Sequence, residues 1–203
     1  MSIPEHTPKR PQFIVVEGLD GSGKSTLAAL LAEHMGAEHL STPMRTLPSS
    51  ARRDAEVMCA ADPLARMLFY ASTVVAASTY VRGALAAGRS VVMDRYWLST
   101  LTYHHHLGAP TLLAEVEAAL VPADVTIFLD VSTAVRRARL IERGSLQAHD
   151  RMTLQPGAGE AIADHYRSFG GQLRVAGRFH ALQADALSID AVVEEALALV
   201  DEP

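Results

Sequence analysis

The sequence predicts an α/β fold in which helices cover both faces of a parallel sheet, forming a three-layer sandwich. Three observations lead to this prediction. Short apolar segments alternate with helical segments along the chain, as in sheets whose parallel strands are joined by helices. The first apolar segment, residues 13–16, is followed by G-x-x-x-x-G-K-[ST] at 18–25 and by an apolar-periodic helix at 27–35. Charged residues follow the strands, at the edge where open α/β sheets bind ligands.

The glycine-rich turn between this strand and helix has the pattern of a P-loop, so the predicted fold is of the P-loop NTPase type. A polyphosphate is a concentrated anion that needs many donors at close range. Glycines let the backbone N–H groups turn inward, and the following helix offers its positive end. Lys24 supplies a mobile charge and Ser25 a hydroxyl for Mg²⁺. We therefore expect this turn to bind phosphate.

The remaining elements are expected in the following order. Further strands are predicted at 37–40, 90–93, 125–129 and 178–183, and further helices at 62–88, 97–107, 110–120, 132–143, 160–175 and 188–200. Asp62 and Pro63 suit the N-cap and first turn of the long helix. Residues 49–54, which lie near several arginines, are expected to be either a solvated loop or an anion-binding loop, and residues 144–156 a long polar loop.

Composition limits the classes of partner. A chain of 203 residues that is 49% hydrophobic suits one domain, which we expect at 12–203, with 1–11 as a disordered lead-in. A net charge of −5 argues against nucleic acid or a membrane surface as partner, and charges interrupt every long apolar stretch. The single cysteine, Cys59, excludes an intrachain disulfide and favours the cytoplasm.

A second cluster of candidate residues follows the strand predicted at 90–93. An Asp in this position of a P-loop protein, here Asp94, is expected to contact Mg²⁺, and the adjacent Arg95 can hold a second phosphate. A structural ion pair is the alternative. Two phosphorylated ligands facing each other would make the protein a phosphoryl-transfer enzyme. If the acceptor is itself a phosphate, its oxygen is already anionic and no general base is needed.

Arginines are concentrated on the helix predicted at 132–143. Arg136, Arg139 and Arg143 share a face of this helix, whereas Arg137 points away. The set is either a solvated basic face or part of an Arg-rich lid, about 144–156, that closes over the nucleotide and excludes water. The three adjacent histidines at 104–106 point in different directions on a helix, so no metal site is expected there.

Together these residues resemble the thymidylate kinase family of nucleoside monophosphate kinases. The resemblance covers almost the whole chain and rests on the segment from Glu17 to Thr26, Leu68-Phe69-Tyr70-Ala71, Asp94-Arg95-Tyr96 with Ser99 and Tyr103, Leu129-Asp130-Val131, and Arg137-Ala138-Arg139 with Asp150-Arg151. It implies a five-stranded parallel sheet, ATP and Mg²⁺ as cofactors, a nucleoside monophosphate as substrate, and a homodimer.

The resemblance also implies roles for individual residues. The ATP phosphates would be bound by Gly18, Leu19, Asp20, Gly21, Ser22, Gly23, Lys24, Ser25 and Thr26, and Mg²⁺ by Ser25 and Asp94. The acceptor nucleotide would contact Asp20, Thr42, Arg45, Phe69, Thr73, Arg95, Tyr103 and His104. Among these, Arg95 would hold the acceptor phosphate, Phe69 would stack on the base and Tyr103 would line the sugar pocket. The catalytic set would be Lys24, Asp20, Arg95, Arg139, Arg143 and Arg151.

Two departures from the family pattern bear on the substrate. The usual Arg-Glu-Pro-Gly loop is replaced by Thr42-Pro43-Met44-Arg45, and the arginine that reads the thymine edge in the family is replaced by Thr73. Both this loop and the segment from Asp94 to Thr100 look more like the mitochondrial UMP-CMP kinase branch. A wider pyrimidine range, including TMP, dUMP, CMP and UMP, is therefore expected.

Other functions remain open at the level of sequence. A small GTPase is disfavoured, because it would need an N-K-x-D motif and this chain contains no asparagine. A P-loop kinase of a nucleoside or another small hydroxyl substrate would need a base, for which Glu17 or Asp94 could serve. A nucleotide sensor without catalysis is a further alternative.

Overall fold

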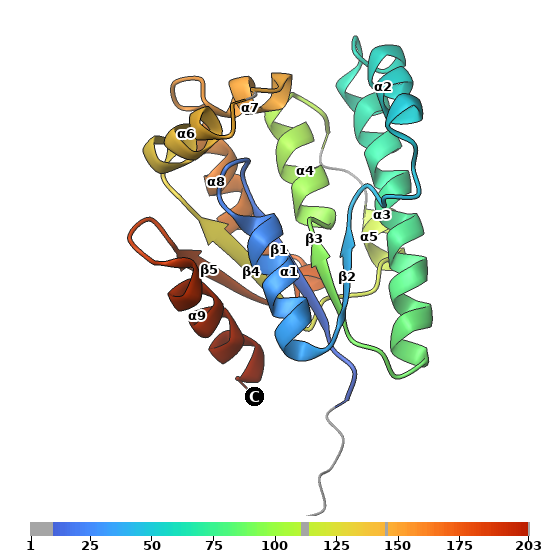
Figure 1. The fold of residues 1–203 in the computed structure, drawn as a ribbon. Helices are drawn as coiled ribbons and strands as arrows, with labels where there is room; N and C mark the ends of the chain where they lie inside the picture. Colours follow the sequence, from blue (N-terminus) through green and yellow to red (C-terminus); the bar gives the residue numbers. More distant parts are fainter. Residues whose placement is uncertain (1–9, 111–113, 145, 203) are drawn as a thin grey trace, which may run out of the picture.

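The computed structural model describes residues 10–110, 114–144 and 146–202. Its centre is one sheet of five strands in the order β2-β3-β1-β4-β5 (Figure 1). All neighbouring strands pair in parallel. The strands are β1 (Phe13–Gly18), β2 (Glu38–Ser41), β3 (Val91–Asp94), β4 (Val125–Asp130) and β5 (Arg178–Gln183). The predicted five-stranded parallel sheet is thus confirmed.

Helices cover both faces of this sheet. They are α1 (Lys24–Met35), α2 (Ser49–Met58), α3 (Pro63–Ala86), α4 (Trp97–His106), α5 (Ala114–Ala119), α6 (Thr133–Glu142), α7 (Ala148–Thr153), α8 (Ala158–Gly170) and α9 (Ile189–Asp201), with a short 3₁₀ helix at Arg174–Ala176. Figure 1 shows α1 and α9 in front of the sheet. The three-layer arrangement agrees with the predicted P-loop NTPase type of fold.

Alternation along β1 explains the two cores. Phe13 and Val15 point to one face, where they join buried side chains of α3 and α4. Ile14 and Val16 point to the other face and join those of α1 and α9. Successive side chains of a strand point to opposite faces, so an apolar run is required when both faces are covered. The P-loop therefore begins at the end of a strand that is buried along its whole length.

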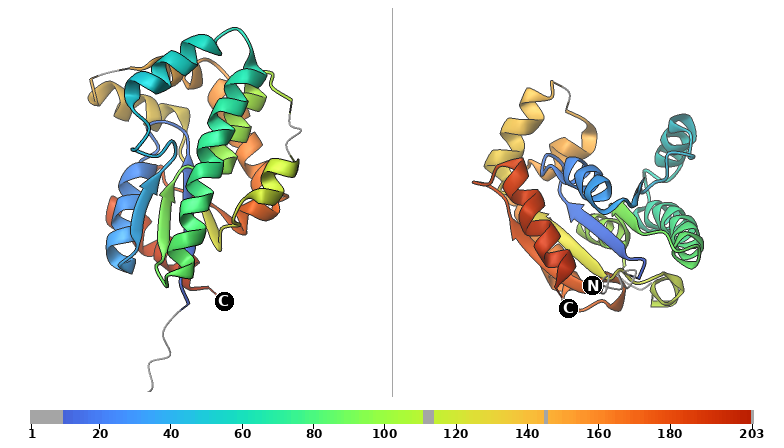
Figure 2. Two further views of the ribbon diagram at one scale, coloured as in Figure 1. Left: turned by 90° about the vertical axis from the view of Figure 1, so that its right-hand side faces the viewer. Right: turned by 60° about the horizontal axis from the view of Figure 1, so that its bottom comes forward.

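The carboxyl ends of the strands lie at one end of the molecule, where α2, α6 and α7 gather (Figures 1 and 2). Two of these helices replace predicted loops. Residues 49–54 belong to α2, and the predicted polar loop at 144–156 contains α7. The prediction of loops was wrong because α2 buries no side chain completely and α7 has only six residues, so neither shows apolar periodicity.

Other boundaries shift by smaller amounts. Helix α8 ends at Gly170, short of the predicted 175, and the 3₁₀ helix follows at Arg174–Ala176. Helix α5 falls within the predicted 110–120, of which 111–113 lie outside the described residues. Residues 1–9 of the predicted lead-in also lie outside them, while Arg10 donates to Asp124 at 2.7 Å.

Within the described ranges, α3 is the one helix that is long and apolar enough to cross a membrane, judged by length and composition. Core helices of globular proteins pass the same test, and α3 contributes Met67, Val74 and Val81 to the first core. This helix is therefore weak evidence for a membrane segment.

Candidate active site

The P-loop turns tightly between β1 and α1. Gly21 and Gly23 have φ angles of +82° and +98°, a region that L side chains rarely adopt. A Cβ on Gly21 would also lie 2.9 Å from the carbonyl oxygen of Arg136 on α6. Position 21 thus requires glycine for two reasons, its positive φ angle and its close contact with α6. Helix α1 begins at Lys24, so its N-terminal N–H groups face the loop.

Asp20 and Lys24 form a buried pair inside this loop. The Nζ atom of Lys24 lies 3.5 Å from Oδ1 of Asp20 and 3.5 Å from the carbonyl oxygen of Leu19. Burial, together with the positive charge of Arg95, lowers the pKa of Lys24 to about 8. Burial opposes the charge of Asp20, but the surrounding cations prevail and hold the pKa of that carboxyl well below its usual value.

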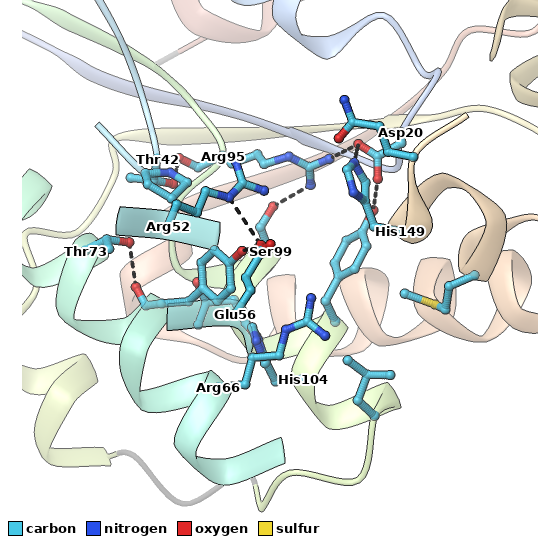
Figure 3. A pocket seen from close by; sticks show the side chains of 17 residues that line it. Asp20, Thr42, Arg52, Glu56, Arg66, Thr73, Arg95, Ser99, His104 and His149 are labelled. Carbon is cyan, nitrogen blue, oxygen red and sulfur yellow. Dashed lines mark hydrogen bonds and ion pairs between the residues drawn. The ribbon is translucent and has the colours of Figure 1, made fainter. Parts of the chain in front are cut away.

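Arg95 reaches the same carboxylate from the end of β3. Its Nη2 atom donates to Oδ1 of Asp20 at 2.6 Å, and its Nη1 atom donates to Oγ of Ser99 at 3.1 Å (Figure 3). Burial disfavours the guanidinium charge, but Asp20 outweighs it and raises the pKa of Arg95 well above its usual value. The hydroxyl of Tyr103 donates to the second oxygen, Oδ2, at 3.2 Å. Lys24 and Arg95 therefore share one crevice.

Arg95 has an unusual backbone. Its φ angle is +68°, and it is the one non-glycine residue with positive φ in the described part of the chain. Such strain persists only where neighbours hold it, and it is concentrated at functional sites. Here the Arg95 amide donates to the carbonyl of Val16 at 3.0 Å, and the Thr42 hydroxyl donates to the carbonyl of Arg95 at 2.8 Å.

Glu17, near the end of β1, is completely buried. Its carboxylate accepts hydrogen bonds from the Tyr96 amide at 2.9 Å, from the Ser99 amide at 3.2 Å and from the Ser99 hydroxyl at 2.5 Å. It also lies 3.4 Å from the hydroxyl of Tyr166 on α8. Burial raises the pKa of Glu17, against the lowering effect of these hydrogen bonds. The residue therefore holds the first turn of α4, and with it the Ser99 partner of Arg95.

A cavity of about 360 Å³ opens beside Asp20 and Arg95 (Figure 3). Its size falls within the range of small-ligand pockets. Helices α2, α3, α4 and α7, the P-loop, the loop after β2 and the turn after β3 line it with the side chains of Asp20, Thr42, Pro43, Arg52, Glu56, Arg66, Tyr70, Thr73, Arg95, Ser99, Thr100, Tyr103, His104, Leu107, Gln147, His149 and Met152.

Most of the residues predicted to contact the acceptor line this cavity. They are Asp20, Thr42, Thr73, Arg95, Tyr103 and His104. Arg45 is exposed and Phe69 is half-buried, and neither is among the lining residues. Tyr70 lines the cavity instead, together with Arg66 and Thr73 of the same helix. Residues 66, 69, 70 and 73 share one face of α3, and this helical spacing was the signal that could have identified Arg66 and Tyr70 from sequence.

The predicted lid arginines lie in different places. Nη1 of Arg139 donates to the carbonyl oxygen of Ser22 in the P-loop at 2.8 Å. Arg143 donates to the buried carboxylate of Asp150 at 2.5 Å, and Arg151 is exposed. Arg136, which was expected on a solvated or lid-facing surface, is instead buried and donates to the carbonyl oxygen of Asp20 at 3.2 Å. Helix α6 is thus fastened to the P-loop.

The residues predicted to hold Mg²⁺ fit a hard cation with oxygen ligands. Oδ1 of Asp94 is buried and has no hydrogen-bond partner in the described ranges. Its charge acts on Lys24, which places it beside the P-loop, and Ser25 is exposed at the start of α1. An orphaned carboxylate oxygen at this edge suits Mg²⁺, which binds through one or two carboxylates together with phosphates.

A different group of possible metal ligands combines Asp20, His149 and Asp150, and it is the one such group among the residues described. The Oδ1 atom of Asp20, however, already faces the Arg95 guanidinium and the Lys24 ammonium. Two nearby cations repel a divalent ion, so this group is better explained as a contact between α7 and the P-loop.

Comparison with known proteins agrees with this geometry. The family model described as "Thymidylate kinase" matches residues 16–156. A thymidylate kinase of Francisella philomiragia is 30% identical over 210 residues, covering 94% of this chain and 98% of that protein. A probable thymidylate kinase of Natronomonas pharaonis is 31% identical over 198 residues, covering 90% and 95%.

Two solved structures support the fold. A thymidylate kinase from Ehrlichia chaffeensis has a TM-score of 0.67 at 21% identity, covering 95% of this chain and 99% of that one. A thymidylate kinase from Candida albicans has a TM-score of 0.71 at 19% identity, covering 95% and 92%.

Proposed function

The chain belongs to the thymidylate kinase family, and from this membership we propose that its preferred acceptor is thymidine 5′-monophosphate. The protein is a nucleoside monophosphate kinase that uses ATP as phosphoryl donor. The predicted family, class of enzyme and donor are thereby confirmed. A kinase of nucleosides or other hydroxyl substrates is not favoured.

The proposal for the site rests on one observation, the convergence of Lys24 and Arg95 on Asp20. We assign the ATP phosphates to the P-loop from Gly18 to Thr26 and the acceptor phosphate to Arg95. Both cations lie within reach of the same carboxylate oxygen, so two phosphates bound to them would be adjacent. Transfer in line between two such phosphates is the geometry that phosphoryl-transfer enzymes use.

Catalysis on this assignment depends on position and charge. The oxygen of the acceptor phosphate is already anionic, so no side chain has to remove a proton. Lys24 and Arg95 neutralise the charge that spreads over the transferred group. Mg²⁺ held by Ser25 and Asp94 would neutralise further charge on the phosphates. Tyr103, beside Asp20, would face the sugar.

We propose that residues 144–156 act with α6 as a lid. Arg139 contacts the P-loop carbonyl of Ser22, and Arg143 holds Asp150 at the base of α7. Arg151, on the exposed side of α7, would approach ATP on closure. A closed lid excludes water and prevents ATP from being hydrolysed. Residues 12–203, which include the lid, form the single domain of this proposal.

A panel of acceptors tests this function. ADP release is measured with ATP and Mg²⁺ against TMP, dUMP, CMP, UMP, AMP, GMP and free nucleosides. We expect the highest kcat/KM with TMP. Turnover of nucleosides but of no monophosphate would reject the proposal in favour of a hydroxyl kinase, and ATP binding without acceptor-dependent turnover would indicate a nucleotide sensor.

We further propose a homodimer that forms through α3. Leu64, Leu68 and Val75 lie within a narrow sector of this helix, and all three are exposed, with Leu68 at 47%. A row of exposed apolar side chains on one helix marks an interaction surface, and a second copy would bring the same row to meet it. No nucleic-acid or membrane partner is proposed, and we propose a cytoplasmic location.

Leu68→Glu is expected to convert this dimer into a monomer, because it places a charge in the centre of the apolar row. Sedimentation velocity over a range of protein concentrations measures the change. Ile141→Glu is the matched control, since Ile141 is exposed on α6, away from this surface, and the variant should sediment like the wild type. A wild type that is monomeric at every concentration would contradict the proposal.

A further inference from the structure

One end of the cavity carries polar groups that phosphoryl transfer does not use. Arg66, Tyr70 and Thr73 project from one face of α3 because they are spaced at i, i+4 and i+7. His104 on α4 lies near Arg66, at the end of the cavity away from Asp20 (Figure 3). Since Arg95 and Asp20 mark the phosphate end, this is the end that the nucleobase of an acceptor would reach.

The hydrogen-bonding state of His104 follows from one contact. Its Nδ1 atom lies 2.6 Å from the carbonyl oxygen of Thr100. A carbonyl oxygen can only accept, so Nδ1 carries the hydrogen. Burial lowers the pKa of His104, against the effect of the Thr100 hydrogen bond, and the positive charge of Arg66 lowers it further. The ring is therefore neutral near pH 7, and its Nε2 atom is an acceptor.

Arg66 offers the opposite kind of group. Its Nε atom is buried and has no hydrogen-bond partner among the residues that the structure describes. The nearby carboxylate of Glu56 already accepts from Nε of Arg52 at 3.2 Å and from the hydroxyl of Tyr70. Buried donors nearly always have a partner, so an unpaired one beside a cavity indicates an acceptor on the ligand.

Thr73 does not compete for that acceptor. Its hydroxyl donates to the carbonyl oxygen of Tyr70 at 2.7 Å, within its own helix. Among the residues at this end of the cavity, the guanidinium of Arg66 and the Nε2 atom of His104 thus form an adjacent donor and acceptor.

We infer that Arg66 and His104 read the edge of the acceptor base and select a pyrimidine with a 4-oxo group and an N3–H. This inference rests on the proposed function. Thymine and uracil present O4 as an acceptor and N3–H as a donor, which match Arg66 and His104 respectively. Cytosine presents an amino donor and an N3 acceptor, so both contacts would be mismatched. The pair takes the place of the base-reading arginine at whose position this chain has Thr73. It also narrows the expected range of acceptors, because cytosine nucleotides would be excluded.

Kinetics with matched substrates test the pair. The value of kcat/KM is measured for dTMP, dUMP, dCMP and the monophosphate of pyrimidin-2-one deoxyriboside, which lacks both the 4-oxo group and the N3–H. We expect the wild type to prefer dUMP over dCMP by about 100-fold or more, because a mismatch leaves buried polar groups unpaired. Arg66→Met, which keeps the stem and removes the donors, should lower kcat/KM for dUMP about 30-fold, mainly through KM. For the pyrimidin-2-one the same variant should change kcat/KM by less than about 3-fold.

Two further variants complete the test. His104→Gln can present either a donor or an acceptor, so it should raise dCMP relative to dUMP by about 10-fold or more. Arg174→Met is the control, because Arg174 is an exposed arginine that does not line the cavity. Thermal unfolding of each variant establishes that it is folded. If Arg66→Met does not fold, the substrate panel measured with the wild type alone still tests the base selection.

The outcomes separate the inference from the proposed function. Equal losses for dUMP and the pyrimidin-2-one in Arg66→Met would show a merely structural role for Arg66 and overturn the inference. Turnover of dCMP and dUMP at similar kcat/KM would also overturn it, while leaving the kinase assignment intact. If no nucleoside monophosphate is turned over although ATP binds, the proposed function and the inference both fail.

Discussion

Replacing Arg95 with alanine is expected to lower kcat/KM for the nucleoside monophosphate by about 100-fold to 1,000-fold, while the Kd for ATP changes by less than about 3-fold. Arg95 is half-buried and donates to Asp20 and Ser99, so its guanidinium is held in place before the acceptor arrives. Its removal takes away the charge that positions the acceptor phosphate. Steady-state kinetics with varied acceptor and calorimetric titration of ATP measure the two effects.

Arg95→Lys separates the effect of the charge of Arg95 from that of its shape. A lysine keeps the charge but lacks the planar fork that can reach two oxygens at once, so we expect an intermediate loss of about 10-fold. Arg174→Ala should leave both quantities unchanged, since that residue is exposed and does not line the cavity. An equal loss of ATP affinity in Arg95→Ala would place Arg95 on the donor side instead.

Glu17→Ala is expected to lower the free energy of unfolding by about 3 kcal/mol, because it leaves several buried donors without an acceptor. Those donors are the amides of Tyr96 and Ser99 and the hydroxyls of Ser99 and Tyr166. For a protein of this size the Tm should fall by about 6–12 °C. Urea unfolding and calorimetry measure the change.

Glu17→Gln serves as the partner variant, since it keeps one acceptor oxygen and removes the buried charge. We expect a smaller loss, about 1 kcal/mol near pH 7. Glu33→Ala, at an exposed position of α1, should change stability by less than about 0.5 kcal/mol. If Glu17→Ala unfolds like Glu33→Ala, the carboxylate does not hold α4.

The raised pKa of Glu17 also predicts a pH dependence. Because the folded protein binds this proton more tightly than the unfolded chain, the contribution of Glu17 to stability is complete below about pH 4.5 and is lost as the pH rises through the raised pKa. The stability of the wild type relative to Glu17→Gln should therefore decline from pH 4.5 toward pH 8. Unfolding at several pH values tests the sign.

The parts of the molecule that sequence predicts well are those whose signals are local. The P-loop pattern lies within a single stretch of chain, and each buried strand shows its own apolar run, so the sheet and its active edge could be placed. Asp94 and Arg95 could be placed at this edge for the same reason, because Asp94 ends β3 and Arg95 follows it directly.

The parts that were missed depend on contacts across the fold. Helix α2 has no side chain of its own in the cores, and the hydrogen bonds of Glu56 with Arg52 and Tyr70 contribute to holding it. Arg136 was expected on a solvated or lid-facing surface, but its partner, the carbonyl of Asp20, lies 116 positions away in the chain. Such partners have no signature in the local pattern of either segment.

The carboxylate of Asp20 has a consequence for how tightly anions are held. It faces both Lys24 and Arg95 before either meets a phosphate, and so it acts as a resident counter-ion. Each phosphate that binds must displace this carboxylate from Lys24 or Arg95, because neither cation is unpaired beforehand. The exchange lowers the net gain of association, which favours rapid departure of charged products and a shallow dependence of affinity on ionic strength.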